Sequence, residues 1–304
     1  MKPVIEVEHL RKTYGSTVAV GGVSFDVAEG EIFGLLGPNG AGKTTTVECL
    51  QGLRHFDAGR IRVLGFDPQL EGQALRQRIG SQLQESALPD RIKVWEALDL
   101  FASFAPGASD WRLLMEQWGL DDKRNASFSS LSGGQRQRLF VALALVNNPE
   151  VVFLDEMTAG VDPAARRVAW DLIRAIRDRG TTVVLVTHFM DEAEQLCDRV
   201  AVVDQGRIIA LDAPQGLIAT YSGGIRVIFS TECTDLSWLE EVPHVRRVTR
   251  RGPRVEVEGS GPVLALVAAA LVDHGITLSN LRVKQPTLEN VFLTITGHGI
   301  QNRG

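Results

Sequence analysis

Residues 37–45 read Gly37-Pro38-Asn39-Gly40-Ala41-Gly42-Lys43-Thr44-Thr45, which fits the pattern G-x-x-x-x-G-K-[ST]. An apolar run precedes them at residues 32–36, and a helix-like run follows from Thr44 to Leu53. The glycines let the backbone curl so that several N–H groups point at one anion, and the start of the helix adds partial positive charge. Lys43 can then reach the β- and γ-phosphates of a nucleotide, while the Thr44 hydroxyl can bind Mg²⁺. A glycine-rich turn with a chance lysine is the alternative, but the flanking strand and helix favour a phosphate-binding loop.

The composition is that of a globular chain. Its 304 residues are 44% apolar and 23% charged with a net charge of −5, which allows one large domain or two smaller ones. No lysine- or arginine-rich block occurs, so nucleic acid is not an expected partner. Three separated cysteines, Cys49, Cys197 and Cys233, favour a reduced cytosolic protein over a disulfide framework or a zinc site. The first ten residues do not form a signal peptide, and the longest apolar run, Val263–Val272, is too short to span a bilayer. Any membrane role would therefore need a separate membrane partner.

Apolar strands alternate with helical patterns through the first two thirds of the chain, which predicts a mostly parallel sheet with helices on both faces. The phosphate-binding loop, Asp155 and His188 each follow one of these strands, so they are expected to meet at the carboxyl ends of the strands. Residues 225–304 instead follow a β-α-β-β-α-β order, typical of a ferredoxin-like domain. We predict an α/β P-loop NTPase fold at residues 1–220, with an antiparallel N-terminal subdomain and a helical insert at about 93–147. A small α+β accessory domain is predicted at 225–304.

A second anion site is predicted where Leu131-Ser132-Gly133-Gly134-Gln135 opens a helix, because the two glycines expose backbone N–H groups at its start. An ordinary serine cap of a helix is the alternative. The pair Asp155-Glu156 ends an apolar strand. There the aspartate can hold Mg²⁺ and the glutamate can orient or deprotonate a water molecule. An acidic loop after a core strand would look the same in sequence.

Taken in order, these motifs resemble the ABC ATPases, the nucleotide-binding subunits of ABC transporters. Residues 131–135 read as the LSGGQ signature of that family, and the resemblance covers roughly residues 4 to 215. It implies that Glu156, His188 and Gln84 are catalytic, and that Thr44, Gln84 and Asp155 bind the metal. The nucleotide contacts that it implies are Tyr14, Gly37, Asn39, Gly40, Gly42, Lys43, Thr44, Thr45, Ser132, Gly133, Gly134, Gln135 and Asp162. Two positions depart from the family pattern: Met157 stands where proline is usual, and Val161 where leucine is usual.

The family resemblance also implies ATP and Mg²⁺ as cofactors and a head-to-tail homodimer in which each nucleotide lies between the phosphate-binding loop of one subunit and the signature of the other. An integral membrane permease is the expected second partner, which would hold the subunit at the cytoplasmic face of the membrane. Residues 285–293 resemble the C-terminal element of exporters of drugs, lipids or polysaccharides, with Asn290 where aspartate is usual. We therefore predict an export ATPase subunit.

Two other classes remain open at this point. A soluble ABC-type ATPase in DNA repair or translation would usually carry long coiled coils or a second cassette, and neither pattern occurs here. A small-molecule kinase built on a phosphate-binding loop would not need the signature or Glu156.

Overall fold

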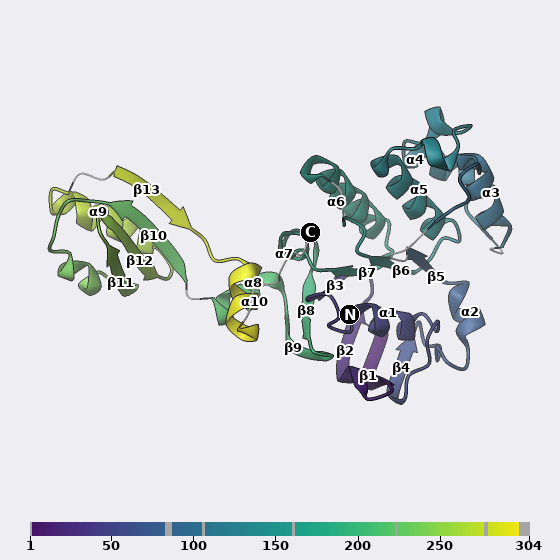
Figure 1. Ribbon diagram of the computed structural model, residues 1–304, viewed down its shortest axis with the longest axis horizontal. Helices are drawn as coiled ribbons and strands as arrows, with labels where there is room; N and C mark the ends of the chain where they lie inside the picture. Colours follow the sequence, from purple (N-terminus) through teal and green to yellow (C-terminus); the bar gives the residue numbers. More distant parts are fainter. Residues whose placement is uncertain are drawn as a thin grey trace. The chain divides into compact units, whose positions relative to one another are not determined.

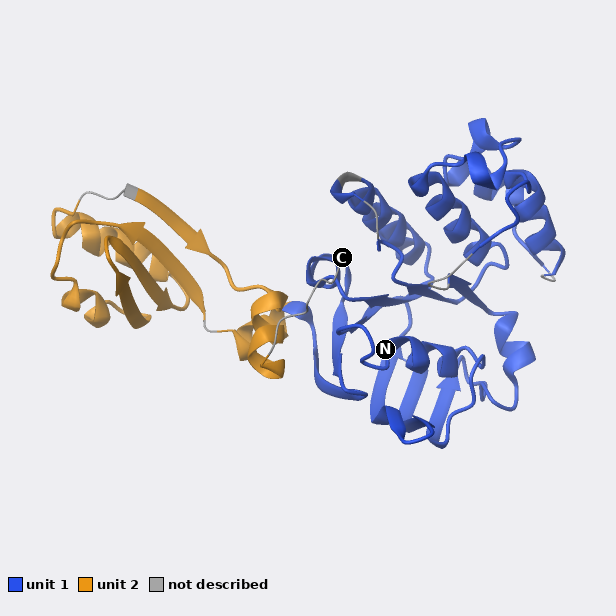
Figure 2. Cartoon of the chain, in the orientation of Figure 1, with its two compact units in different colours: residues 1–214, 300–304 blue, residues 215–299 orange. Residues whose placement is uncertain are grey.

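The computed structural model describes residues 2–82, 87–104, 107–159, 162–222, 224–276 and 279–297. It divides into two compact units, one ending at Pro214 and the other beginning at Gln215 (Figure 2). Within the described residues, no helix is long and apolar enough to cross a membrane.

The first unit is built on a six-stranded sheet in the order β5-β6-β7-β3-β8-β9 (Figure 1). Neighbouring strands are parallel except for the hairpin of β8 and β9. The four inner strands are almost wholly buried, which explains their continuous apolar sequences. The strand bounds are β3 Ile32–Leu36, β5 Ile79–Gln82, β6 Val151–Asp155, β7 Thr182–Thr187, β8 Arg199–Asp204 and β9 Arg207–Asp212.

A three-stranded antiparallel sheet, β2-β1-β4, shares its core with this larger sheet. Its strands alternate buried and exposed residues, as expected when one face packs and the other meets solvent. Phe25 of β2 stacks on Phe33 of β3, with ring centroids 5.2 Å apart, and this contact joins the two sheets. The bounds are β1 Pro3–Tyr14, β2 Thr17–Ala28 and β4 Ala58–Val63. The predicted antiparallel N-terminal subdomain is therefore confirmed.

Helices cover the remaining surfaces of the first unit. They are α1 Lys43–Leu50, α2 Gly72–Arg76, α3 Val94–Ser103, α4 Trp111–Gln117, α5 Gly133–Leu145, α6 Pro163–Asp178 and α7 Met190–Leu196. Two 3₁₀ turns, η1 Asp121–Lys123 and η2 Phe128–Ser130, separate α4 from α5. The α3–α5 group lies apart from α6 and α7 in Figure 1, as expected for an insert.

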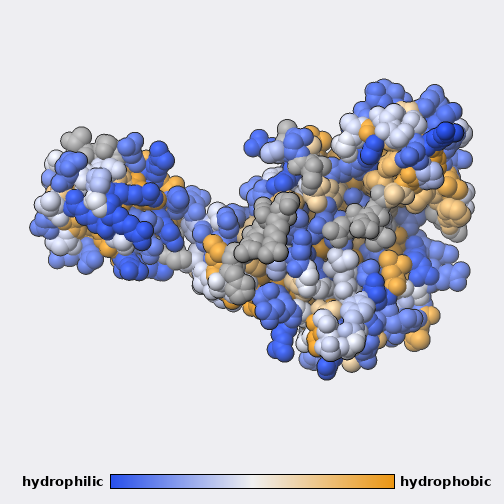
Figure 3. Space-filling view, in the orientation of Figure 1, coloured by the Kyte–Doolittle hydropathy of each residue, from blue (hydrophilic) through white to orange (hydrophobic). Residues whose placement is uncertain are grey.

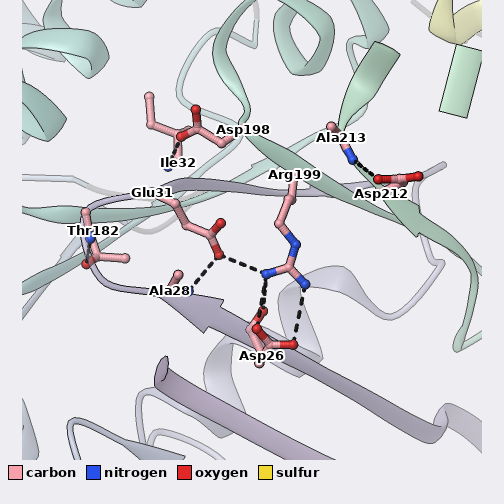
Figure 4. Close-up of polar contacts among 10 residues, drawn as sticks. Asp26, Ala28, Glu31, Ile32, Thr182, Asp198, Arg199, Asp212 and Ala213 are labelled. Carbon is pink, nitrogen blue, oxygen red and sulfur yellow. Dashed lines mark hydrogen bonds and ion pairs between the residues drawn. The ribbon is translucent and has the colours of Figure 1, made fainter. Parts of the chain in front are cut away.

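A charged network fixes the start of β3, at the opposite end from the phosphate-binding loop (Figure 4). Arg199 Nη1 lies 3.1 Å from Asp26 Oδ2 and 3.3 Å from Glu31 Oε1. Glu31 Oε1 also accepts a hydrogen bond from the Ala28 amide at 2.7 Å, and Asp198 accepts one from the Ile32 amide at 2.8 Å. Strands from both sheets therefore share one anchor, which sets where β3 begins.

The second unit carries an antiparallel sheet in the order β11-β12-β10-β13. Chain order β10, η3, β11, β12, α9, β13 with this strand order is the ferredoxin-like topology, although the first helix is only a 3₁₀ turn. The bounds are α8 Pro214–Tyr221, β10 Ile225–Ser230, η3 Ser237–Glu241, β11 Val245–Arg251, β12 Arg254–Gly259, α9 Val263–Asp273, β13 Ser279–Lys284 and α10 Leu288–Thr296.

The closing helix α10 buries Leu288, Val291 and Phe292, so one face of the helix is apolar. Asn290 accepts a hydrogen bond from the Thr287 amide at 3.1 Å, which caps the start of the helix. This hydrogen bond gives Asn290 a structural role.

Candidate functional site

The phosphate-binding loop connects β3 to α1 and keeps its shape through close backbone contacts. A Cβ on Gly42 would lie 2.2 Å from the Ala19 carbonyl oxygen, and one on Gly37 would lie 2.1 Å from the Val203 carbonyl oxygen. Gly40 and Gly42 also have φ angles of 81° and 97°, which glycine adopts without strain. Only glycine fits these positions.

Lys43 turns its ammonium group into this loop. Its Nζ donates hydrogen bonds to the Gly37 carbonyl at 2.8 Å and the Pro38 carbonyl at 3.0 Å. Burial lowers the pKa of Lys43, and the nearby carboxylates of Glu156 and Asp155 oppose that shift. The positive charge is therefore held among backbone carbonyls and acidic side chains, beside a cavity that could receive phosphate oxygens.

That cavity has a volume of about 280 Å³, and Glu156 lines it together with the loop. The lining residues are Ala19, Asn39, Gly40, Gly42, Lys43, Thr44, Thr45 and Glu156. β3, β6 and β7 are neighbours in the sheet, and the loop, Glu156 and His188 follow them respectively. The carboxyl ends of these strands bring distant segments of the chain to one place, as predicted.

Glu156 and His188 contact each other directly. The imidazole Nδ1 of His188 lies 3.1 Å from Glu156 Oε1. Glu156 has a φ of 48°, in the left-handed region that non-glycine residues seldom occupy. This backbone conformation aims the carboxylate at the cavity and costs free energy.

Thr44 and Asp155 make the arrangement expected of a divalent-cation site. Thr44 Oγ1 donates to Asp155 Oδ2 at 3.0 Å, while Asp155 Oδ1 is buried and has no hydrogen-bond partner among the described residues. Burial raises the pKa of the Asp155 carboxyl to about 6, although the Thr44 hydrogen bond opposes that shift. A buried carboxylate oxygen without a partner beside a hydroxyl fits a hard cation such as Mg²⁺. Gln84, the third predicted metal ligand and a predicted catalytic residue, lies outside the described residues.

The signature residues do not line this cavity. Ser132 caps α5 and forms a capping box with Gln135: the Ser132 amide donates to Gln135 Oε1 at 2.9 Å, and the Gln135 amide donates to Ser132 Oγ at 3.4 Å. A Cβ on Gly133 or Gly134 would meet nothing within 4 Å. The helix start is therefore open to an approaching group, and the serine cap and the anion site can coexist.

Two other predicted nucleotide contacts also lie away from the cavity lining. Tyr14 is 42% exposed, and Lys12 and Arg54 lie 5.5 and 5.3 Å from its ring centroid. Asp162 accepts a hydrogen bond from the Ala165 amide at 3.0 Å at the start of α6. Gly160 and Val161, which precede Asp162 in the chain, lie outside the described residues.

The sequence gives no signal for a buried carboxylate behind His188. Glu192 on α7 is fully buried and accepts a hydrogen bond from Trp170 Nε1 of α6 at 3.2 Å. Burial raises its pKa, and the hydrogen bond from Trp170 opposes that shift. Glu192 thus joins α7 to α6. Its partner is 22 positions away in sequence, so only the fold reveals the contact.

Comparisons with known proteins agree with this geometry. A family model described as ABC transporter matches residues 20–159. The daunorubicin resistance ATP-binding protein DrrA2 of Streptomyces coeruleorubidus is 37% identical, over 98% of this chain and 96% of its own length. The Nod factor export ATP-binding protein I of Paraburkholderia xenovorans is 40% identical, over 98% of both chains.

Solved structures give the same result. The structure of cbiO1 from Clostridium perfringens, part of the ABC transporter complex cbiONQ, has a TM-score of 0.66 at 27% identity and covers 72% of this chain and 92% of that one. A dimeric structure of the ATP-binding cassette MJ0796 with ADP and Pi has a TM-score of 0.62 at 25% identity and covers 69% and 98%. The phosphate-binding loop, the acidic strand end and the signature helix are all present, and the relatives align over almost the whole chain, so this chain belongs to the ATP-binding proteins of ABC transporters.

Proposed function

We propose that this chain is the ATP-hydrolysing subunit of an exporter and works as a head-to-tail homodimer on a separate membrane permease. One observation carries the catalytic part: Glu156 lines the cavity of the phosphate-binding loop and contacts His188 at 3.1 Å. Export is supported by the names of relatives aligned over almost the whole chain.

In this proposal the loop amides and Lys43 bind the β- and γ-phosphates, and Tyr14 stacks on the adenine. Glu156 accepts a proton from water as the water oxygen bonds to the γ-phosphorus. The bond from that phosphorus to the bridging oxygen breaks, and ADP and phosphate are released. His188 holds the carboxylate and the γ-phosphate in line. Thr44 and Asp155, with Gln84, would hold Mg²⁺, which supplies positive charge to the phosphate oxygens when bound.

The second copy completes the site through its signature helix. Ser132, Gly133, Gly134 and Gln135 lie off the cavity of their own chain, and their open helix start suits an anion brought by a partner. Asp162 would lie near this shared contact. The solved dimer of the related cassette MJ0796, with ADP and Pi, supports an assembly of this kind.

The permease contact is proposed at a hollow of about 690 Å³ in the first unit, lined from β5, α3 and α5. Phe101 and Phe104, which are 38% and 74% exposed, form part of its apolar wall. Figure 3 shows hydrophobic colouring over the region where α3 lies. A short amphipathic segment of a membrane protein would cover these rings. The accessory domain at residues 225–304 remains a prediction, with a proposed role in steadying the dimer.

Lys43→Ala tests the catalytic proposal, with Lys123→Ala as the matched control, because Lys123 lies on the exposed turn η1. We expect the first variant to lose ATP hydrolysis and the second to retain it. ATPase activity of purified Lys43→Ala near that of the wild type would refute the assignment.

Phe101→Asp/Phe104→Asp tests the permease contact, with Leu113→Asp on α4 as the control, because Leu113 is 55% exposed and does not line the hollow. We expect unchanged ATP binding but loss of co-purification with the integral membrane protein that the wild-type chain recovers from detergent-solubilised membranes. Equal recovery of that protein by all three chains would contradict the docking site.

A further inference from the structure

The four-stranded sheet of the second unit has one covered face and one open face. Val227, Phe229, Val255 and Val257 point to the covered face, where they pack with α9 in one apolar core. Strand register places their neighbours on the opposite face, which no described helix covers in this core. The charged residues of the open face are Arg226, Arg247, Arg251, Arg254, Arg282, Lys284, Glu256 and Glu258.

The charge on this face is unusual for the chain. Residues 215–299 contain eight arginines and lysines and eight aspartates and glutamates, so the unit is neutral within a chain of net charge −5. Six of the eight cations lie on the open face, with only two of the acids. Arg251 and Arg254 are even paired directly across two strands. Like charges in that position destabilise a sheet, so folding alone does not favour the cluster.

Four of these arginines surround a hollow of about 450 Å³ on β10, β11 and β12. Arg226 is held in place, because its Nη1 lies 3.2 Å from Glu256 Oε1 and its Nε lies 3.4 Å from Glu258 Oε1. Arg247, Arg251 and Arg254 are exposed, and the described part of the chain offers them no ion pair within 4 Å. The hollow therefore combines one fixed guanidinium with three that are available to a ligand.

We propose that this hollow binds a small solute that carries two or more phosphate groups together with hydroxyl groups, such as a sugar bisphosphate or a nucleotide. Arginine matches phosphate through paired N–H donors, and three free guanidiniums can neutralise more than one phosphate. Glu256 and Glu258 each use one oxygen for Arg226, so their second oxygens can accept hydrogen bonds from sugar hydroxyls. The volume lies in the range of small-molecule sites. This site is separate from the phosphate-binding loop and from the proposed permease contact.

Other occupants fit the same face less well. A two-fold contact between copies would set the basic face against itself. Single-stranded nucleic acid is usually bound by aromatic stacking, and the open face has no aromatic ring among its described residues. A bilayer of anionic lipids is favoured by a uniformly basic surface, whereas here two carboxylates line the hollow.

The test uses the full-length chain without added nucleotide, because MgADP itself carries two phosphates and hydroxyl groups and would compete for the hollow; binding at the phosphate-binding loop is then the same in every variant of the open face. Fructose 1,6-bisphosphate and inorganic tripolyphosphate are titrated by calorimetry into the wild type and Arg247→Ala/Arg254→Ala. Arg246→Ala is the matched control, because it removes an exposed charge from the same strand outside the hollow. We expect the double variant to lose affinity by at least ~10-fold and the control to stay within about twofold of wild type.

Arg247→Lys/Arg254→Lys keeps both charges and removes the paired donors, so it should also bind at least ~3-fold more weakly than wild type. Thermal unfolding of each variant checks that the domain remains folded, and the two single alanine variants replace the double variant if it does not. Equal affinity in the wild type and the arginine-to-alanine variants would overturn the proposal. So would an equal loss in the Arg246→Ala control, which would indicate unspecific charge attraction.

Two further binding assays distinguish a small phosphorylated solute from a lipid surface or a nucleic acid. Flotation with phosphatidylglycerol vesicles and binding of a short single-stranded oligonucleotide are measured on the same four chains. Binding to vesicles or to the oligonucleotide that depends on Arg247 and Arg254, without binding of either small probe, would overturn the proposal in favour of a macromolecular surface. Dependence of the small-probe affinity on these two arginines is the supporting result.

Discussion

Replacing Gly37 by alanine should disable the phosphate-binding loop through one backbone contact. The new Cβ would lie 2.1 Å from the carbonyl oxygen of Val203 in β8, whereas ordinary contact begins near 3.4 Å. Neither atom is the end of a flexible side chain, so the backbone must move by at least about 1 Å. A displacement of that size at a reacting group costs about 100-fold in rate, and overpacking of this kind costs about 1–3 kcal/mol of stability.

Gly65→Ala is the matched control, because Gly65 lies outside the phosphate-binding loop, a Cβ there meets nothing within 4 Å and the strain is confined to its φ of 83°. That strain costs roughly 1–2 kcal/mol, similar to the expected loss of stability in Gly37→Ala, but it leaves the contact between β3 and β8 intact. Thermal unfolding should therefore shift comparably in the two variants, by roughly 2–4 °C per kcal/mol. Binding of a fluorescent ATP analogue and ATP turnover should fall steeply only in Gly37→Ala. If both variants bind and hydrolyse ATP alike, the steric reasoning is wrong.

Four other variants test separate parts of the structure. Glu156→Gln should bind ATP without hydrolysing it and run as an ATP-dependent dimer on a sizing column; a monomer with wild-type turnover would exclude Glu156 as the base. Ser132→Arg should abolish ATPase activity, and mixing it with Lys43→Ala should restore ATP-dependent association, since one shared site then keeps both intact motifs; no rescue between two folded chains contradicts that sharing. Burial raises the pKa of Glu192 above its ordinary 4.5, so the folded chain binds this proton more tightly than the unfolded chain and stability falls as pH rises through that range. Glu192→Gln should therefore gain thermal stability relative to wild type at pH 8 compared with pH 5, and a pH-independent difference would contradict the burial argument. A chain truncated after Tyr221 should bind ATP about normally but lose export or stable dimerisation; an insoluble product would show that the remainder belongs to the ATPase core.

The sequence predicts best those elements whose whole length follows one pattern of apolar residues. The inner strands are apolar throughout because both faces are covered, and α6 begins at Pro163 and ends at Asp178 as its pattern indicates. The short helices α2 and α8 escape prediction. Each contains a glycine, at Gly72 and Gly216, and helices of this length depend on tertiary contacts rather than on their own propensity.

The residues of the candidate site also fall into two groups, those that a local sequence pattern predicts and those that it does not. The phosphate-binding loop, Asp155 and Glu156 are local patterns that follow strands, so strand order alone brings them together. The contact of Glu192 with Trp170 joins residues 22 positions apart, and the arginines of the open sheet face meet only through strand register. Neither arrangement has a local sequence pattern, because each depends on how separate elements pair.

The backbone of Glu156 has a consequence for how this chain can change. A left-handed φ of 48° is free of strain only for glycine, so the native glutamate lowers the stability of the folded chain by roughly 1–2 kcal/mol at this position. Selection or engineering for thermal resistance alone would replace it, and with Glu156 as the proposed base the more stable protein would no longer hydrolyse ATP. Thermal stability and ATP hydrolysis thus place opposite demands on this one residue. A stabilised variant that keeps its activity needs substitutions at other positions.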